Sequence, residues 1–311
     1  MKKPLLIIAG GTATGKSDAA VALAHRIGGE IISADSMQVY KHMTIGTAKP
    51  SIEEMQGIPH YLVDELMPDE EYSAAIFQKK AQAHIGDITS RGKTPIVCGG
   101  TGFYINALLY GTDFTETETD TTLRDELQAI ADAEGQEAFH ARLAAIDHAA
   151  AQAIHANNVR RVIRALEYHA QTGRRISEHN AEQKQREADY NAQTIILTRD
   201  RLELYDRIDK RVDIMIERGL IDEVQWLLDA GYHEKLPSMR GLGYKEIAAY
   251  LRGAYSLDEA VRILKRDTRH FAKRQRTWFR HQAPEGTQTV MMHLGEDANA
   301  AADKMLPLLR I

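Results

Sequence analysis

Short apolar runs alternate with amphipathic stretches over the first hundred residues of the chain. Four runs are nearly continuous in apolar residues and end in a turn or a polar group, as buried strands do. They cover residues 5–9, 30–34, 61–63 and 94–98. Helical periodicity lies between them, over 17–26 and 73–91. Because strands alternate with helices and are largely apolar, we predict an α/β fold around a doubly wound parallel sheet.

The pattern changes beyond the first hundred residues. The stretch 111–137 contains nine acidic residues and one basic residue, Arg124. Helical periodicity follows, and a short apolar run at 194–197 predicts a return to the sheet. Helices broken at glycines then fill 202–281. We therefore predict two domains. They are a core of residues 1–111 and 191–311 with C-terminal helices, and a helical insertion of residues 112–190.

The composition is that of a folded protein that does not cross a membrane. The chain has 311 residues, of which 43% are apolar and 27% charged, and its net charge is −5. No run approaches the roughly 18 apolar residues of a membrane-spanning helix. The single cysteine, Cys98, excludes an intramolecular disulfide and fits a reducing compartment, so we expect a cytoplasmic protein. The net charge argues mildly against nucleic acid, but an average can hide a basic patch.

The turn after the first predicted strand matches the phosphate-binding motif G-x-x-x-x-G-K-[ST] completely. Its residues are Gly10, Gly11, Thr12, Ala13, Thr14, Gly15, Lys16 and Ser17. Backbone N–H groups of such a loop and the positive end of the following helix hold a polyphosphate. Lys16 would contact the terminal phosphate oxygens, and Ser17 would bind Mg²⁺. We therefore predict a P-loop NTPase-like core, a type that is typical of nucleotide-binding and ATP-binding proteins, although the motif itself indicates only phosphate.

The metal-binding aspartate of a phosphotransferase is missing from its usual place. The predicted strand 94–98 ends in a second glycine turn, which contains Thr101 but no carboxylate. A carboxylate, Asp35, follows the second strand instead. In a parallel sheet this position lies at the carboxyl edge beside the phosphate loop, where Asp35 could bind a metal or accept a proton. A helix N-cap is the structural alternative for both Asp35 and Thr101.

Positive charge is concentrated near the C-terminus. Residues 262–281 contain eight Lys or Arg and one acid, a net charge of +7. Six of these cations recur at intervals of three and four, which places them on one face of a helix. They are Arg262, Arg266, Arg269, Lys273, Arg276 and Arg280. Leu264, Phe271 and Trp278 fall on the opposite side, so we favour an outward track for a phosphate backbone over an ordinary solvated face.

Two smaller basic groups have structural explanations as well. Arg160, Arg161 and Arg164 lie outside the buried face of a predicted helix, where RNA contact and surface ion pairing are both open. Arg207 and Arg211 are four residues apart on a predicted helix that also carries three aspartates, which favours ordinary ion pairing. The thirteen histidines show no spacing that is typical of a metal site.

Several sequence blocks occur in order between Leu5 and about Gln282. Besides the phosphate loop they cover 32–40, 45–50, 99–104, 161–167, 241–246 and 272–278. In this order they resemble the bacterial tRNA dimethylallyltransferase (tRNA isopentenyltransferase) family, whose members prenylate adenosine 37 beside the anticodon. The chain departs from the family at Gly11, where proline is common, and we expect no functional consequence.

The resemblance implies a mechanism. The phosphate loop would hold the diphosphate of dimethylallyl diphosphate, with Mg²⁺ on Ser17, and would stabilise the departing pyrophosphate. Asp35 would accept a proton from the adenine N6 amine or orient it. Thr101 and Arg124 would contact the reacting groups. An ion pair explains Arg124 less well, because Arg124 is the only cation in an acidic stretch.

The resemblance also implies contacts with the anticodon stem-loop of tRNA, from which adenosine 37 must flip out to reach the sheet edge. The contacting residues would be Asp35, Ser36, Met37, Gln38, Arg160, Arg161, Val162, Ile163, Arg164, Arg240, Gly241, Leu242, Gly243, Tyr244, Lys245, Arg269, His270, Phe271, Ala272, Lys273, Arg274, Gln275 and Arg276. We expect a monomer whose partners are tRNA and dimethylallyl diphosphate, with no membrane.

Two other functions are compatible with the motifs. A nucleoside or small-metabolite kinase would use the same loop for ATP, and transfer from ATP without transfer from a prenyl donor would identify it. A non-catalytic RNA-binding protein would use the loop as a structural or regulatory phosphate site. In that protein Asp35 would have no catalytic role.

Overall fold

The computed structural model describes residues 2–114 and 122–310, and the chain divides into two compact units. One unit consists of Met1–Leu109 with Ala188–Ile311, and the other of Tyr110–Glu187. The sequence pattern placed the division at 112 and 190. The returning chain joins the first unit before 190, because the Asp189 N–H donates to Leu109 O. Part of the predicted acidic stretch, 115–121, lies outside the described residues.

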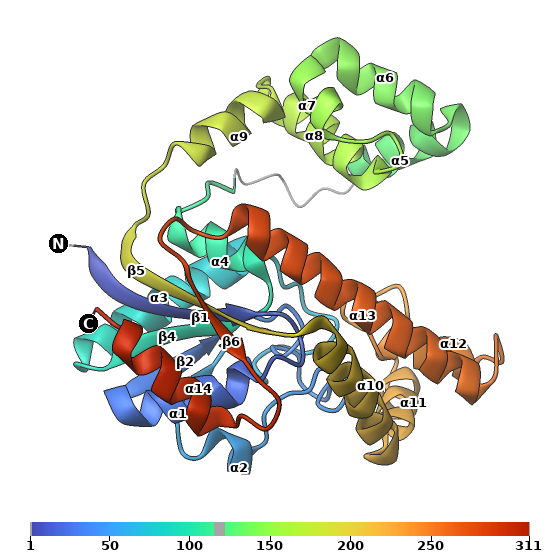
Figure 1. Ribbon diagram of the computed structural model, residues 1–311. Coiled ribbons are helices and arrows are strands. Elements are labelled where there is room, and N and C mark those ends of the chain that lie inside the picture. Colours follow the sequence, from blue (N-terminus) through green and yellow to red (C-terminus); the bar gives the residue numbers. More distant parts are fainter. Residues whose placement is uncertain (1, 115–121, 311) are drawn as a thin grey trace. The chain divides into compact units, whose positions relative to one another are not determined.

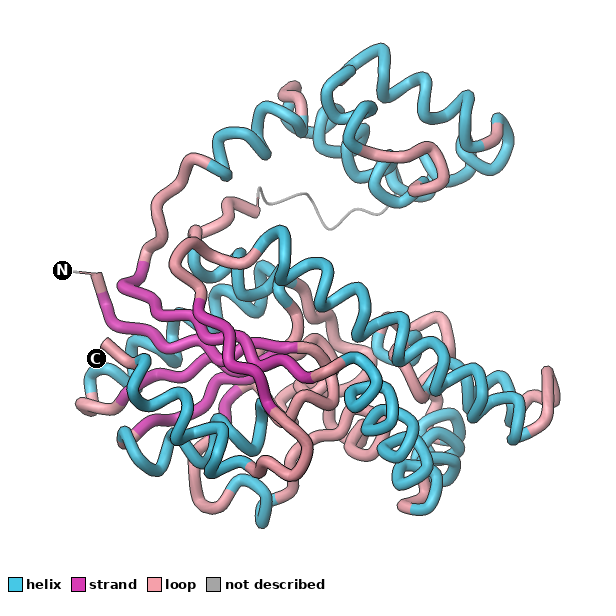
Figure 2. Tube along the Cα trace, in the orientation of Figure 1, coloured by secondary structure: helices cyan, strands magenta, loops and turns pink. Residues whose placement is uncertain are grey.

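A six-stranded sheet forms the centre of the first unit, and every pairing between neighbouring strands is parallel. The strands are β1 (Lys3–Gly10), β2 (Gly29–Ser33), β3 (His60–Tyr61), β4 (Thr94–Gly99), β5 (Tyr190–Arg199) and β6 (Gln288–Met292). Their order across the sheet is β3-β2-β4-β1-β5-β6, and Figure 2 shows them as one twisted layer. The prediction of an α/β fold with a parallel sheet is confirmed.

The edge strand β6 was missed by the sequence pattern. It is five residues long and its side chains alternate between buried and exposed, so it lacks the continuous apolar run of the inner strands. In register, Leu197 of β5 is opposite Val290 of β6.

Helices cover both faces of this sheet, as Figure 1 shows. On one face α1 (Lys16–Ile27) contacts α14 (Ala298–Met305), and their apolar residues pack with those of the strands. The other face carries α3 (Ala74–Ser90) and α4 (Gly102–Leu109), together with the end of α13 (Leu257–Gln282). Two serines begin these helices, since the Ser73 side chain accepts from the Ile76 N–H and Ser256 accepts from the Glu259 N–H.

A second apolar cluster lies beyond the carboxyl ends of the strands. It joins the segment after β2 to the helices α10 (Arg201–Glu217), α11 (Leu220–Asp229), α12 (Tyr244–Leu251) and α13. Val39, Met43 and Tyr244 are fully buried there. Shorter elements in this unit are α2 (Ile52–Met55) and the 3₁₀ turns η1 (Ser238–Arg240) and η2 (Leu306–Leu308). This packing holds the segment after β2 against helices α10 to α13 of the same unit.

The second unit is helical. Its helices are α5 (Thr122–Glu134), α6 (Gln136–Ile146), α7 (His148–Ala153), α8 (Val159–Thr172) and α9 (Ile176–Lys184). Phe139, Leu143 and Val162 form the centre of its own apolar core. In either unit, no helix among the described residues has the length and apolarity needed to span a membrane.

Candidate active site

The phosphate loop leaves β1 at Gly10 and enters α1 at Lys16. Ala13 has φ 62° and Gly15 has φ 90°, so two left-handed residues turn the loop onto the helix N-terminus. Glycine adopts this conformation without steric cost. Thr14 Oγ1 donates to Gly11 O over 2.9 Å, a hydrogen bond within the loop that stabilises its turn. A glycine-rich turn at the start of a helix has the geometry of an anion site.

Lys16 bends back over this loop, with Nζ 3.4 Å from Gly11 O. Burial lowers the pKa of the Lys16 ammonium below its ordinary value of 10.5, and the Asp35 carboxylate offsets part of this effect. An anion bound beside Nζ would stabilise the charged form and raise the pKa again. The ammonium is therefore coupled to whatever anion occupies the loop.

This coupling predicts a pH dependence of anion binding. Binding prefers charged Lys16, so pyrophosphate affinity should weaken as pH rises through the lowered pKa, at a lower pH than for an unperturbed lysine. Calorimetric titration with pyrophosphate at a series of pH values measures the dissociation constant and the proton uptake on binding. An affinity that stays constant until the ordinary lysine pKa would contradict the coupling.

Asp35 and Thr101 come together because β2 and β4 are neighbours in the sheet. Each residue lies two positions after its strand, and the Thr101 N–H donates to Ala34 O over 3.2 Å. The strand ends approach so closely that a Cβ on Gly99 would lie 2.2 Å from Ala34 O, so only glycine fits there. Since β4 also pairs with β1, the carboxylate, the threonine and the phosphate loop follow three adjacent strands.

One oxygen of Asp35 caps a turn. Asp35 Oδ1 accepts the Met37 N–H over 2.8 Å and the Gln38 N–H over 3.4 Å, and because no helix begins there, Asp35 caps a turn and is not the helix N-cap that the sequence allowed. Among the described residues, Oδ2 has no hydrogen-bond partner, and the side chain is only half-buried. The turn fixes the carboxylate through one oxygen and leaves the other available to a ligand.

Asp35 and the phosphate loop line the same cavity, which has a volume of about 510 Å³. Lys16, Ser17 and Asp35 lie along it, and the segment 44–51 after β2 forms another part of its wall. Thr101 is not among its lining residues, although its backbone is bonded beside Asp35. A group held in the loop could therefore react with a second molecule that reaches Asp35.

Two arginines of α10 also face this cavity, contrary to the sequence-based expectation. Arg207 Nε donates to Ala13 O over 2.9 Å, and Arg211 Nη1 lies 3.5 Å from Thr12 Oγ1. The three aspartates expected to pair with them bond other cations. These pairs are Asp206 with Lys210, Asp209 with Arg269 and Asp213 with Lys265. The sequence did contain a signal for this. Arg207 and Arg211 lie on α10, which directly follows β5, and β5 pairs with the strand that leads into the phosphate loop.

The environment of Arg211 favours an anionic ligand. Burial lowers the pKa of its guanidinium, and the charge of Arg207 adds to this effect. Neither arginine forms an ion pair within residues 2–114 and 122–310. Asp18 and Glu54, which line the same cavity, partly offset this lowering of the pKa, and a phosphate oxygen would give the guanidinium a direct anionic partner.

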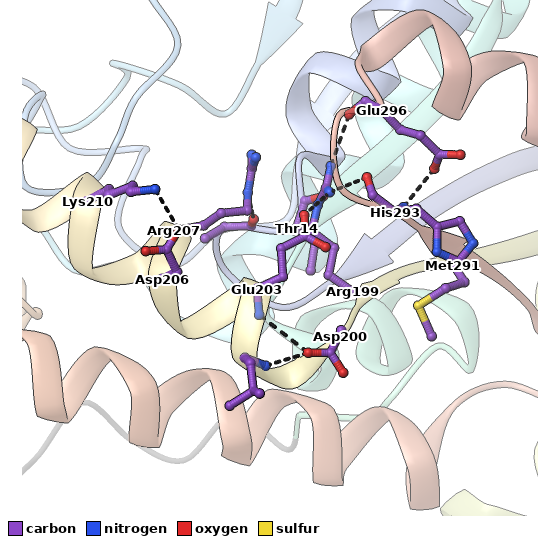
Figure 3. A network of polar contacts seen from close by, with 12 residues as sticks. Thr14, Arg199, Asp200, Glu203, Asp206, Arg207, Lys210, Met291, His293 and Glu296 are labelled. Atoms are coloured by element: carbon purple, nitrogen blue, oxygen red, sulfur yellow. Dashed lines mark hydrogen bonds and ion pairs between the residues drawn. The ribbon is translucent and has the colours of Figure 1, made fainter.

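Arg199 also binds the loop, at the residue after the one that Arg207 contacts. Its guanidinium is buried and donates through Nε to Thr14 O over 3.0 Å and through Nη1 to His293 O over 3.1 Å. Figure 3 shows Arg199 between Thr14, Glu203 and the turn before α14. The last residue of β5 therefore ties the phosphate loop to the C-terminal part of the chain.

The basic face of α13 is partly neutralised inside the protein. Arg262 pairs with Glu259, Arg266 with Asp267 and Arg269 with Asp209. Lys273, Arg276 and Arg280 are exposed and form no ion pair with any described residue. The outward cationic surface of the helix is therefore its second half.

Several residues in the predicted tRNA-contacting ranges have buried side chains, and their contact with tRNA stays a prediction. They are Val162, Ile163, Tyr244, Ala272 and Gln275. The first two belong to the core of the helical unit, and Tyr244 donates its hydroxyl to Glu223. A range matched to a family motif includes both faces of a helix, whereas only one face reaches solvent.

Arg124 lies in the helical unit, on α5. Its Nη2 donates to Glu167 Oε2 over 2.9 Å, and Glu167 is buried on α8, where Arg164 also pairs with it. The ion pair that the sequence pattern disfavoured is therefore present. The pattern missed it because the carboxylate comes from another helix, 43 residues further along the chain.

Fold and site together define a class of protein: an α/β enzyme whose P-loop shares a cavity with a carboxylate that follows the second strand away from the loop's own strand. Within this class the chain belongs to the IPP transferase family, whose sequence model matches residues 38–282. The resemblance inferred from the sequence blocks is confirmed.

Relatives of known name agree with this family. The chain is 51% identical to a tRNA dimethylallyltransferase of Lachnoclostridium phytofermentans, covering 99% of this chain and 97% of the relative. A second relative, from Acetivibrio thermocellus, has the same name and is 54% identical over 89% of this chain and 88% of its own.

Solved structures show the same similarity. The full-length tRNA isopentenylpyrophosphate transferase of Bacillus halodurans matches with a TM-score of 0.74 at 42% identity, over 99% of this chain and 96% of that one. A eukaryotic dimethylallyltransferase acting on tRNA matches with a TM-score of 0.83 at 30% identity, over 97% of this chain and 78% of that one.

Proposed function

We propose that this protein transfers the dimethylallyl group of dimethylallyl diphosphate to N6 of adenosine 37 in the anticodon loop of tRNA and releases pyrophosphate. The observation that carries the proposal is the single cavity lined by both the phosphate loop and Asp35. A leaving group and a nucleophile can be held at its two sides. The names of the relatives, and the large share of each chain that the similarity covers, support the same reaction.

The reaction divides between the two sides of the cavity. The N6 nitrogen forms a bond to the allylic carbon, the carbon–oxygen bond to the diphosphate breaks, and its electron pair leaves with pyrophosphate. Asp35 Oδ2 would take the proton that N6 loses, since neutral adenine N6 is a poor nucleophile without a base. Thr101 lies beside Asp35 and would help to position the amine.

Cations on the opposite wall would stabilise the pyrophosphate. Lys16 lies over the loop, and Arg207 and Arg211 reach the same loop from α10. Negative charge grows on the diphosphate as the carbon–oxygen bond breaks, so fixed cations there favour the transition state over the bound substrate. A role for Arg124, which lies in the helical unit, in contacting the reacting groups stays a prediction.

Mg²⁺ would be held by few protein atoms. The described part of the chain contains no cluster of three or more carboxylate, imidazole or thiol groups that could bind a metal. Ser17 lines the cavity, and Mg²⁺ commonly combines one or two protein oxygens with phosphate oxygens and water. The residues therefore fit a metal that arrives with the diphosphate. When bound, it would neutralise charge on the leaving group.

The test is direct. Unmodified tRNA is incubated with the protein, Mg²⁺ and dimethylallyl diphosphate, and its nucleosides are then separated by mass. We expect adenosine heavier by one dimethylallyl group at position 37, and none when ATP replaces the prenyl donor. Transfer of phosphate from ATP with no prenyl transfer would establish a kinase instead.

The tRNA would lie along the exposed cations of α13, and the insertion would add Arg160 and Arg161, which are also exposed.

The single described cysteine, Cys98, is buried and free. This supports the expected reducing, cytoplasmic location, where a monomer would meet its tRNA.

Salt dependence distinguishes true phosphate contacts on α13. Replacing Lys273 and Arg276 by glutamine should weaken tRNA binding and reduce the slope of log affinity against log salt by about one unit per lost phosphate contact. Arg269→Gln should change the slope less, because Asp209 already neutralises Arg269. Fluorescence titrations at several salt concentrations measure these slopes. Equal slopes in the wild type and the double variant would make this surface an ordinary solvated face.

A further inference from the structure

The side-chain amide of Gln275 connects two loops of the active site. Gln275 lies on α13 and is only 7% exposed. The Thr12 N–H donates to Gln275 Oε1 over 2.8 Å, and Gln275 Nε2 donates to Gly100 O over 3.1 Å. One amide therefore joins the phosphate loop after β1 to the turn after β4 that carries Thr101.

The fit around this amide is tight. A Cβ on Gly100 would lie 2.3 Å from Gln275 Nε2. Glycine at 100 therefore leaves the space that the amide fills. Both ends of the amide are bonded to buried or half-buried backbone groups, and neither is directed to a surface ligand. Such a bridge is costly to break, because it leaves backbone groups without partners.

We propose that Gln275 is a positioning residue that sets the separation between the diphosphate-binding loop and the Thr101 turn. It acts through the backbone of Thr12 and Gly100 and touches neither substrate. The proposal rests on the proposed function, because it assumes that the two loops bind reacting groups. It replaces the expectation that the Gln275 side chain contacts tRNA. That role belongs to its neighbours Lys273 and Arg276, which are exposed on the same helix.

Two substitutions to methionine on α13 separate these roles. Gln275→Met keeps the length of the side chain and removes both hydrogen bonds. Lys273→Met removes an exposed cation two residues away. Each variant and the wild type are measured for inorganic pyrophosphate binding with Mg²⁺, for tRNA binding, for kcat and the KM of dimethylallyl diphosphate, and for thermal stability.

We expect Gln275→Met to weaken pyrophosphate binding and lower kcat, each by about tenfold or more, with tRNA affinity within about twofold of wild type. Lys273→Met should show the reverse: weaker tRNA binding and unchanged pyrophosphate binding. A purely structural role for Gln275 would lower the melting temperature without changing pyrophosphate affinity of the folded protein. That result would overturn the proposal, as would weakened tRNA binding with normal pyrophosphate binding.

A substitution on the other side of the bridge guards against misfolding of Gln275→Met. Gly100→Ala keeps glutamine at position 275, but the new Cβ would lie 2.3 Å from Nε2 and would push the amide away from Gly100 O. The same loss of pyrophosphate affinity is expected, and normal affinity would contradict the proposal. The pyrophosphate measurement needs no prenyl transfer, so it tests Gln275 even if the wild type fails to prenylate tRNA. Failure of prenylation by the wild type would count against the proposed function alone.

Discussion

Replacing Asp35 by asparagine is expected to lower kcat for prenyl transfer by about 10²–10⁴, the range that a general base commonly contributes. Asparagine has nearly the same shape, and its Oδ1 can still accept the Met37 N–H that holds the turn. Only the ability of the second atom to take a proton is lost. Binding of tRNA should stay close to wild type, because the loop keeps its conformation. Single-turnover transfer and a separate tRNA titration measure the two effects.

The matched control is Asp303→Asn. Asp303 is an exposed carboxylate on α14 that pairs with Arg26, away from the cavity lining, so its loss should leave transfer unchanged. Retention of transfer by Asp35→Asn would remove Asp35 as the base. Loss of tRNA binding together with transfer would mean that the carboxylate binds RNA, and the non-catalytic alternative would then regain support.

Substitution of Lys16 by methionine should have a comparable effect at the other side of the cavity. The ammonium belongs to the loop itself and lies over it, and burial already disfavours its charge, so a bound anion would stabilise it. Removal of one preorganised electrostatic contact commonly lowers kcat by about 10²–10³. Pyrophosphate affinity should fall as well, since the product carries the same charges as the leaving group.

Lys41→Met provides the comparison, because Lys41 is exposed and lies outside the cavity lining. Its transfer rate and pyrophosphate affinity should match those of the wild type. Normal pyrophosphate binding by Lys16→Met would place the diphosphate elsewhere. The arginines of α10 would then be the next residues to replace.

The local sequence determined the parts of this protein that depend on neighbouring residues. The phosphate loop is recognisable because its glycines, lysine and serine must follow one another to place backbone N–H groups at a helix end. Four inner strands are recognisable because burial on both faces requires continuous apolar runs. Given a parallel sheet, even the placement of Asp35 at the edge followed from its position after β2.

Only the tertiary structure determined the groups that surround these residues. Gln275 reaches Thr12 across 263 positions and Arg207 reaches Ala13 across 194, and no local pattern records such a pairing. The basic face of α13 and the aspartates of α10 look independent in the sequence, yet Asp209 neutralises Arg269 and thereby leaves Arg207 and Arg211 to the cavity. Charge and periodicity along one segment show which side chains are available. Their partners depend on which segments pack together, because hydrogen bonds and ion pairs act over a few ångströms of space whatever the distance along the chain.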